Sequence, residues 1–217
     1  MLQGADKLAV ALSGGKDSLT LLFMLKAILG RGLPNPPLVA IHVDGAFSCG
    51  ASLEKQFLTS ICQKMDIPLV IRSSEKKNHP LQCYSCARER RKILFQAAKE
   101  MGCSHIAFGH HKDDAAATLL LNLLHKAEFA SMMPKVHMER YGVTILRPLF
   151  YVEEEEIKRF AQMHQFQRIS CKCPVGQRSK RKASRDIITF MERHFPHAKT
   201  NLFQAGEEFG SKKALTP

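Results

Sequence analysis

Apolar residues gather in short runs along the chain, and most of these runs end beside Gly, Pro or Asp. Runs of this length without polar alternation are typical of strands that are buried on both faces of a sheet. We predict such strands at residues 8–12, 38–43, 68–71, 106–108 and 143–146.

Longer segments between these runs place apolar residues every three or four positions, which is the spacing of one helix face. This spacing predicts helices at residues 18–29, 53–65, 88–101, 113–124 and 153–165. Strands that alternate with helices predict an α/β fold, in which a doubly wound, mostly parallel sheet is covered by helices on both faces.

The alternation stops after Gln165. We therefore predict a nucleotide-binding domain at residues 1–165 and a basic C-terminal extension at residues 166–217. The apolar spacing in the extension predicts one more helix, at about residues 184–194.

The composition is that of a globular protein, with 45% hydrophobic and 24% charged residues. Lys and Arg outnumber Asp and Glu by 32 to 20, and the resulting net charge of +12 favours a polyanionic partner. No apolar run is long enough to span a bilayer and no signal-peptide pattern is present, so we expect a cytoplasmic protein without a membrane partner. Seven cysteines in such a protein indicate thiol, metal or redox chemistry rather than disulfides.

The stretch Ser-Gly-Gly-Lys-Asp-Ser, from Ser13 to Ser18, joins the first predicted strand to the first predicted helix. Its glycines allow backbone N–H groups to face outward, and the start of the helix adds a partial positive charge. Lys16 supplies a full charge, and the two serines supply hydroxyl donors. Together these features predict a phosphate-binding site.

This stretch is not a Walker A loop, because Val10 stands where that motif has its first glycine and Asp17 follows Lys16. A carboxylate beside a bound phosphate requires a cation between them, so we interpret Asp17 as an Mg²⁺ ligand. The simpler alternative is an ordinary strand-to-helix turn that is capped by Ser18.

A second polar loop, Gly-His-His-Lys-Asp-Asp from Gly109 to Asp114, follows the strand predicted at residues 106–108. Its paired carboxylates can hold Mg²⁺ or position a phosphate, and Asp113 also suits the N-cap of the next helix. Capping within a solvated polar loop is the simpler alternative.

Asp44 ends the strand predicted at residues 38–43, where a nucleoside would lie across the edge of the sheet. A simple Asp-Gly turn is an equal alternative there. Ligands of parallel sheets bind beyond the carboxyl ends of the strands. We therefore expect residues 13–18, 44–49 and 109–114 to share one nucleotide site.

The two loops resemble the two signatures of the PP-loop ATP pyrophosphatases, with Ala117 standing where those families commonly have Glu. These enzymes cut ATP between its α and β phosphates and adenylate a substrate oxygen. The resemblance implies catalytic roles for Lys16, Asp17 and Asp113, with Mg²⁺ as cofactor. The ATP site that we predict comprises Ser13, Gly14, Gly15, Lys16, Asp17, Ser18, Asp44, Gly109 and His110.

Two cysteine pairs lie far apart in the sequence, Cys83-x-x-Cys86 and Cys171-x-Cys173. Three or four thiolates from two loops can hold Zn²⁺ or an iron–sulfur cluster, and a redox Cys-x-x-Cys is a third alternative. The remaining cysteines, Cys49, Cys62 and Cys103, are interpreted as core or incidental residues.

The segment C-x-x-C-A-R-E-R-R from Cys83, the second polar loop and the segment L-R-P-L from Leu146 together resemble the tRNA 2-thiocytidine synthetase family. The similarity covers about residues 5 to 206. It implies a four-iron–four-sulfur cluster that is held by Cys83, Cys86 and Cys171, with Cys173 as a rival for the third position and one iron left open. It also implies ATP-dependent replacement of a cytidine C2 oxygen by sulfur, supplied by a donor protein or as sulfide.

Two basic groups flank the cluster cysteines, which favours a track for the phosphate backbone of tRNA. Its predicted residues are Arg88, Arg91, Arg178, Lys180, Arg181 and Lys182. The sequence leaves the oligomeric state open and allows a homodimer. One alternative function is a lysidine synthetase-like ligase with an amine nucleophile, and another is a zinc-stabilised RNA-binding module without catalysis.

Overall fold

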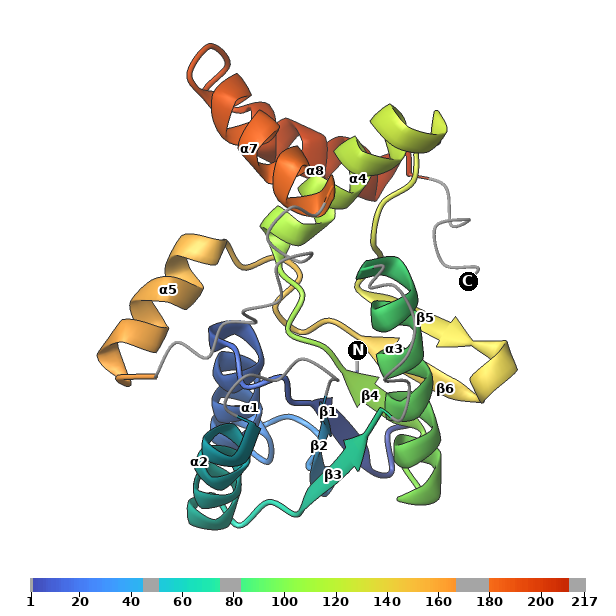
Figure 1. Cartoon of the computed structure of the whole chain (residues 1–217), viewed down its shortest axis with the longest axis vertical. Helices are drawn as coiled ribbons and strands as arrows, with labels where there is room; N and C mark the ends of the chain where they lie inside the picture. The colour runs from blue at the N-terminus through green and yellow to red at the C-terminus, as the bar shows by residue number, and fades with distance from the viewer. Residues whose placement is uncertain (1, 45–50, 75–82, 167–179, 211–217) are drawn as a thin grey trace.

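A computed structural model describes residues 2–44, 51–74, 83–166 and 180–210, with only the backbone at 51–54 and 83–86. Within these ranges six strands form one sheet in the order β3-β2-β1-β4-β6-β5 (Figure 1). All neighbouring strands are parallel except β5 and β6. The strands are β1 (Leu8–Ala11), β2 (Leu38–Asp44), β3 (Leu69–Ser73), β4 (His105–Ala107), β5 (Lys135–Met138) and β6 (Val143–Leu146).

Helices connect the strands and extend the chain beyond the sheet. They are α1 (Lys16–Ile28), α2 (Ala51–Lys64), α3 (Cys83–Glu100), α4 (Lys112–Lys126), α5 (Glu154–Met163), α7 (Lys180–Glu192) and α8 (Ala198–Glu208), with a short 3-10 helix, η1 (Glu139–Tyr141), before β6.

Side-chain alternation in β1 explains the layers of the sheet. Leu8 and Val10 point into a core built with α1, α2 and α5. Ala9 and Ala11 point to the opposite face, where they meet Phe95 and other residues of α3. Both faces of the strand are therefore buried, and α1 and α2 lie on one side of the sheet with α3 on the other (Figure 1).

The strand order changes direction between β1 and β4, which are neighbours in the sheet although far apart in the sequence. At such a point the connections leave the sheet toward opposite faces, and a crevice opens at the carboxyl ends of the two strands. The stretch from Ser13 to Ser18 follows β1, and the loop from Gly109 to Asp114 follows β4. The topology thus brings the two predicted loops to one place.

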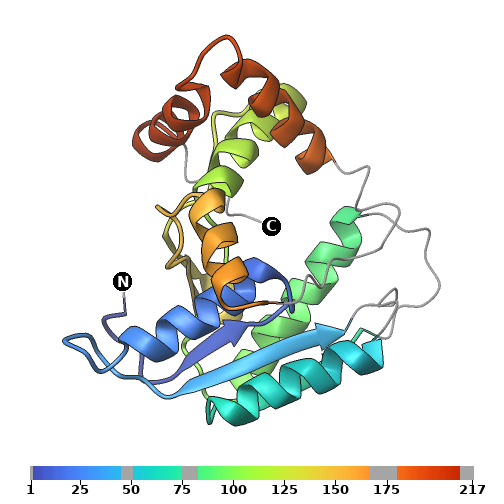
Figure 2. The same cartoon turned by 90° about the vertical axis from the view of Figure 1, so that its left-hand side faces the viewer.

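The C-terminal helices α7 and α8 pack against α4, beyond the carboxyl edge of the sheet (Figure 2). Their contact is an apolar cluster in which Ala116 and Ala117 of α4 meet Ile188 of α7 and Phe203 of α8. Gly206 of α8 packs closely against Ser131 and against Leu119 of α4. A Cβ at Gly206 would lie 2.9 Å from the Cβ of Ser131.

The predicted fold class is confirmed, and each predicted strand and helix is present with small changes at its ends. Helix α3 begins at Cys83, five residues before the predicted start at Arg88. Strand β5 was not predicted, because four residues with one buried position, Val136, give no detectable pattern.

The prediction of a single helix in residues 166–217 is wrong, because both α7 and α8 lie there. Helix α8 was not predicted, because it has few apolar residues and contains Gly206, and glycine disfavours helices. The domain boundary after residue 165 stays a prediction, because residues 167–179 lie outside the described ranges. No helix within those ranges has the length and apolar character needed to cross a membrane.

Two adjacent isoleucines of α7 test this packing. Ile188 is 4% exposed inside the cluster with α4, whereas Ile187 is 41% exposed. We expect Ile188→Ala to lower the free energy of unfolding by about 2–5 kcal/mol, because it removes buried methyl groups and leaves a cavity. Ile187→Ala, the matched control, should cost clearly less. Urea denaturation followed by circular dichroism measures both values, and equal costs would contradict the described position of α7.

Candidate active site

The serines of the first loop bond to each other and to the loop backbone. Ser18 Oγ donates to the carbonyl oxygen of Gly15 at 3.0 Å and accepts from the backbone N–H of Ser13 at 3.2 Å. The two hydroxyl oxygens lie 3.1 Å apart. Gly14 has a φ of +84°, a conformation that glycine adopts without strain. These bonds fix a tight turn that leads directly into α1.

The second loop passes so close to the first that only glycine fits at the crossing. A Cβ on Gly109 would lie 2.8 Å from both the carbonyl carbon and oxygen of Asp17. This contact confirms that the loops after β1 and β4 converge. Of the third predicted loop, only Asp44 lies within the described residues.

A cavity of about 280 Å³ opens between the two loops. Polar groups of both loops line it, and apolar side chains of β2, α3 and the end of β4 complete its wall. The lining residues are Ala11, Leu12, Ser13, Asp17, Ser18, Ile41, Val43, Arg90, Leu94, Phe108, Gly109, His110, Asp114 and Arg185. Such a mixture of a polar end and an apolar wall suits a nucleotide.

Three carboxylates surround the buried ring of His111 at the start of α4. Its Nδ1 lies 3.6 Å from Asp113 Oδ2, and its Nε2 lies 3.5 Å from Asp114 Oδ2 and 3.9 Å from Asp17 Oδ1. Burial opposes protonation of the ring, but the nearby carboxylates of Asp113, Asp114 and Asp17 outweigh it and raise the pKa of His111. The ring therefore favours the charged form that the carboxylates stabilise.

The carboxylates beside this ring remain ionised for a matching reason. Burial raises the pKa of Asp113, but the nearby ring of His111, the bond from the backbone N–H of Glu154 and the ion pair with Lys199 lower it well below its ordinary value. For Asp114, burial is likewise outweighed by the charges of His111 and Arg185, and its pKa falls to about 2. His110 differs, since burial lowers its pKa against the charge of Asp114. A neutral His110 ring therefore faces the cavity and stacks on Phe108.

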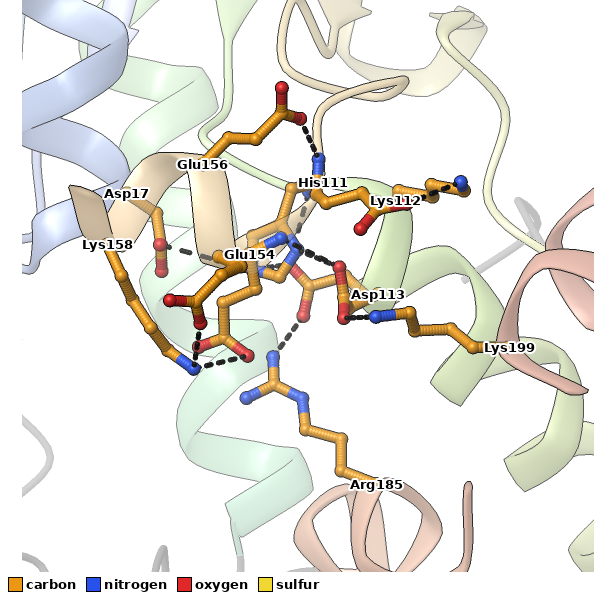
Figure 3. Close-up of polar contacts among 12 residues, drawn as sticks. Asp17, His111, Lys112, Asp113, Glu154, Glu156, Lys158, Arg185 and Lys199 are labelled. Carbon is orange, nitrogen blue, oxygen red and sulfur yellow. Dashed lines mark hydrogen bonds and ion pairs between the residues drawn. The ribbon is translucent and has the colours of Figure 1, made fainter. Parts of the chain in front are cut away.

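Positive groups from four helices balance these carboxylates, and Figure 3 shows Arg185 of α7 and Lys199 of α8 among them. Lys16 of α1 bonds Asp17 at 2.6 Å and Glu154 of α5 at 2.9 Å. Lys199 of α8 lies 3.1 Å from Asp113 Oδ1, and Arg185 of α7 pairs with Asp114 Oδ1. The start of α5 contributes as well, because the Glu154 N–H donates to Asp113 Oδ2 at 2.8 Å.

Most of the predicted ATP-site residues lie together. Ser13, Asp17, Ser18, Gly109 and His110 line the cavity, and Gly14 and Gly15 form the turn beside it. Lys16 and Asp113 belong to the adjacent network of charges, in which Figure 3 shows Asp113.

The structure does not bear out two predictions about carboxylates, that Asp44 lines the ATP site and that Asp113 is the N-cap of its helix. Asp44 is not among the described residues that line the cavity, and it forms an ion pair with Lys55 at 2.6 Å. Asp113 as the N-cap of its helix is wrong. The N-cap of α4 is His111, whose backbone N–H donates to Asp114 Oδ2 at 3.3 Å.

The predicted cluster cysteines are described in part. Cys83 and Cys86 occupy the first turn of α3, of which only the backbone is described. Helix α3 leads away from the carboxyl edge of the sheet, and Arg90, a turn beyond Cys86, donates to the carbonyl of Val43 near that edge. Cys171 and Cys173 lie outside the described residues. Cys62 and Cys103 are buried free thiols as predicted, and burial raises the pKa of Cys62 to about 11.

The predicted RNA-binding side chains divide between two helix starts. Arg88 and Arg91 are exposed on the N-terminal half of α3. Lys180, Arg181 and Lys182 are exposed in the first turn of α7. Arg178 lies outside the described residues.

Five residues of the charge network received no individual role from the sequence, although Asp114 was predicted as one of the paired carboxylates of the second loop. His111 and Asp114 stood within a recognised loop, where their spacing to Asp113 was a usable signal. Glu154 belongs to a run of four glutamates that was interpreted only as a helix start. Arg185 and Lys199 gave no signal, because nothing local in a sequence links them to partners 71 and 86 residues away.

Comparison with known proteins defines the class. The sequence matches the family model of the PP-loop domain over residues 2–188. A tRNA-cytidine(32) 2-sulfurtransferase of Syntrophotalea carbinolica is 33% identical over 213 residues, which cover 94% of this chain and 82% of that protein. The protein of the same name from Geobacter sulfurreducens shows the same identity and coverage.

Among solved structures, the U34-tRNA thiolase NcsA from Methanococcus maripaludis, determined with its four-iron–four-sulfur cluster, superimposes with a TM-score of 0.78. It is 25% identical, and the match covers 96% of this chain and 73% of that one. The chain described here is a PP-loop protein. Within that class it belongs to the family of the tRNA-cytidine(32) 2-sulfurtransferases.

The crossing at Gly109 gives a direct test of the site. Gly109→Ala should push the two loops apart. Because a misplacement of about 1 Å at an active site lowers the catalysed rate about 10²-fold, we expect a loss of ATP-dependent activity of that order. We expect ATP binding, measured by isothermal titration, to weaken as well. The control is Gly32→Ala, which strains a φ of +79° but meets no atom within 4 Å. Unchanged ATP affinity in Gly109→Ala would contradict the described crossing.

Proposed function

We propose that this chain is an ATP-dependent tRNA sulfurtransferase, which adenylates the C2 oxygen of a cytidine in tRNA and replaces that oxygen with sulfur. The observation that carries the proposal is the convergence of the loops after β1 and β4 on one cavity, in a chain of this family. The named relatives act on cytidine 32, and we propose the same base here.

In this proposal the first loop holds the terminal phosphates of ATP. Gly14 and Gly15 allow phosphate oxygens to approach the backbone, and α1 directs its N-terminus at them. Lys16 and the hydroxyls of Ser13 and Ser18 add charge and hydrogen bonds. Donors fixed before ATP arrives stabilise the departing pyrophosphate without reorganisation.

Mg²⁺ would bind to Asp17 and Asp113. Both belong to the cluster of carboxylates around His111, and oxygen ligands of this kind are what Mg²⁺ prefers. The ion supplies charge neutralisation for the phosphates that react. The backbone N–H of Glu154 and the charge of Lys199 hold the pKa of Asp113 low, so this carboxylate is ionised and ready for a cation.

The nucleoside end of the cavity is apolar. Ile41 and Val43 of β2 and Leu94 of α3 face it together with Phe108. These side chains fit the body of adenosine and exclude water, which strengthens the electrostatic contacts at the phosphate end.

The reaction proceeds in two displacements. The cytosine C2 oxygen forms a bond to the α-phosphorus, and the bond from that phosphorus to the β-phosphate oxygen breaks and releases pyrophosphate. Hydrosulfide then bonds to C2, the C2–O bond breaks, and the oxygen leaves as part of AMP. The proton of hydrosulfide passes to solvent, so cytidine, ATP and hydrosulfide give 2-thiocytidine, AMP, pyrophosphate and a proton.

We further propose that Cys83, Cys86 and Cys171 hold a four-iron–four-sulfur cluster, with Cys173 as the rival third ligand. Such a cluster supplies a metal site that keeps sulfide anionic near neutral pH. Support comes from NcsA, which carries such a cluster, and from the position of α3, whose next turns supply Arg90 and Leu94 to the cavity. A sulfur donor protein, a homodimer and a cytoplasmic location also stay proposals.

The comparisons do not favour the two alternatives, a lysidine synthetase-like ligase and a zinc-stabilised RNA-binding module. A single reaction separates all three. Protein purified without oxygen is mixed with tRNA, ATP, Mg²⁺ and sulfide, and AMP and 2-thiocytidine are measured by mass spectrometry.

We expect the wild-type protein to contain iron and labile sulfide and to form both products. Cys83→Ala should lose iron and thiolation but keep tRNA-dependent release of pyrophosphate, since the phosphate site is separate. Cys103→Ala, a buried core thiol, is the matched control and should keep thiolation. Modification that survives Cys83→Ala would favour the ligase, and zinc without AMP formation would favour the RNA-binding module.

The basic residues of α7 give a prediction for tRNA binding. Replacing Lys180 and Lys182 by Gln should weaken tRNA binding and lower the slope of log Kd against log salt by about 1 for each phosphate that the helix no longer neutralises. The control is the double variant Lys26→Gln and Lys64→Gln, an equal change of charge in the last turns of α1 and α2. Fluorescence anisotropy over a salt series measures the slopes. Equal slopes in the wild type and the α7 double variant would show that this helix does not touch the RNA backbone.

A further inference from the structure

One residue of the C-terminal helices lines the cavity. Arg185 of α7 reaches it and pairs there with Asp114 Oδ1, which is 71 residues away in the sequence (Figure 3). Within the described parts of the chain, the other lining residues all come from the sheet, its loops, α1, α3 and α4. A single side chain from a distant helix at such a place calls for an explanation.

The backbone of Arg185 is held firmly in place. Ser184, immediately before it, is buried and bonds the carbonyl of Lys180 at 3.0 Å. Ile188, one turn later, is buried in the cluster with α4. The guanidinium therefore projects from a packed helix rather than from a loose surface, and its position is set by apolar contacts that are independent of the ion pair.

The guanidinium retains donors for a ligand. Its Nε is buried and has no hydrogen-bond partner among the described residues. The planar group offers several N–H donors, and two of them can bind a phosphate in parallel. Asp114 accepts from one nitrogen, Nη2, and holds the plane in a fixed orientation.

The charge of Arg185 is also secured. Burial disfavours that charge, but Asp114, Glu154 and Asp17 outweigh burial and raise the pKa of Arg185. The second cation that lines the cavity, Arg90, donates to the carbonyl of Val43 at 2.8 Å and so belongs to the apolar end. Arg185 instead stands among the carboxylates beside the first loop.

The order of groups along the cavity then fixes what Arg185 meets. Terminal phosphates fit the loop from Ser13 to Ser18, and the nucleoside fits the apolar wall at Ile41 and Phe108. The α-phosphate must lie between these ends, in the region of Asp17, Asp114 and Arg185. We propose that Arg185 is a catalytic residue that contacts a non-bridging oxygen of the α-phosphate, in ATP and in the adenylated cytidine.

This inference rests on the proposed function and adds a residue to it. When the cytosine oxygen attacks, negative charge grows on the non-bridging oxygens of the α-phosphorus. A fixed guanidinium stabilises that growing charge more than it stabilises bound ATP. In the second displacement the same contact stabilises the phosphate of AMP as it leaves. Helix α7 would thus complete the ATP site that the sheet begins.

The experiment measures tRNA-dependent pyrophosphate release in the full chain. We expect Arg185→Gln to lower kcat about 10²- to 10³-fold, the usual loss of one such donor, while the KM for ATP changes only a few-fold. Arg185→Lys should recover part of the rate, because it restores charge without the planar pair of donors. Arg193→Gln, an exposed change of charge just beyond α7, should match the wild type.

Phosphorothioate substrates distinguish direct contact of Arg185 with the α-phosphate from a purely structural role of this residue. The two diastereomers of ATP with sulfur at one non-bridging α oxygen should react at different rates with the wild-type protein. Arg185→Gln should reduce that difference at least about tenfold if Arg185 touches one of those oxygens. A variant with lower kcat but the wild-type difference would overturn the contact, and a variant with unchanged kcat would overturn the catalytic role.

Failure of the two proposals can be distinguished. A wild-type protein that releases no pyrophosphate with tRNA would defeat the proposed function and this inference with it. An active wild-type protein with an equally active Arg185→Gln would defeat this inference alone. If Arg185→Gln does not fold, as judged by urea denaturation, the decision passes to Arg185→Lys. An unchanged preference between diastereomers in that variant would count against the contact.

Discussion

Two adjacent carboxylates at the start of α4, Asp113 and Asp114, impose the constraint on which the rest of the site depends. Both are largely removed from water, and an uncompensated charge in such a place costs several kcal/mol. Several groups compensate these two charges: the backbone N–H of Glu154, the ring of His111, and cations from α7 and α8. The C-terminal helices are therefore tied to the sheet by charge as well as by the apolar cluster around Phe203.

The sequence was informative wherever a physical rule acts locally. Apolar runs identified five of the six described strands, and the rule for parallel sheets correctly predicted that the loops beginning at Ser13 and Gly109 would meet. Helix α8 was not predicted because it contains Gly206. Strand β5 was not predicted because it is an edge strand of only four residues. The pairs of Arg185 and Lys199 could not be predicted at all, since they depend on how α7 and α8 dock.

Ala117 illustrates how packing bears on a departure from a motif. The sequence has Ala where related families commonly have Glu, three residues after Asp114. In the structure this position is fully buried in the cluster with Ile188 and Phe203. A carboxylate at this position would lie among apolar side chains, whereas the run of three alanines from Ala115 lets α7 and α8 approach α4 closely. Asp114, one turn earlier in α4, is balanced by Arg185 and has no second carboxylate at position 117 beside it.

The location of Arg185 and Lys199 late in the chain also matters during synthesis. Domains generally fold in the order in which they leave the ribosome, and the sheet with both of its loops is translated before α7 and α8. A nascent chain that has only reached β6 would hold Asp113 and Asp114 without two of their cations. The network of charges around Asp113 and Asp114 is thus completed only after α7 and α8 have been translated.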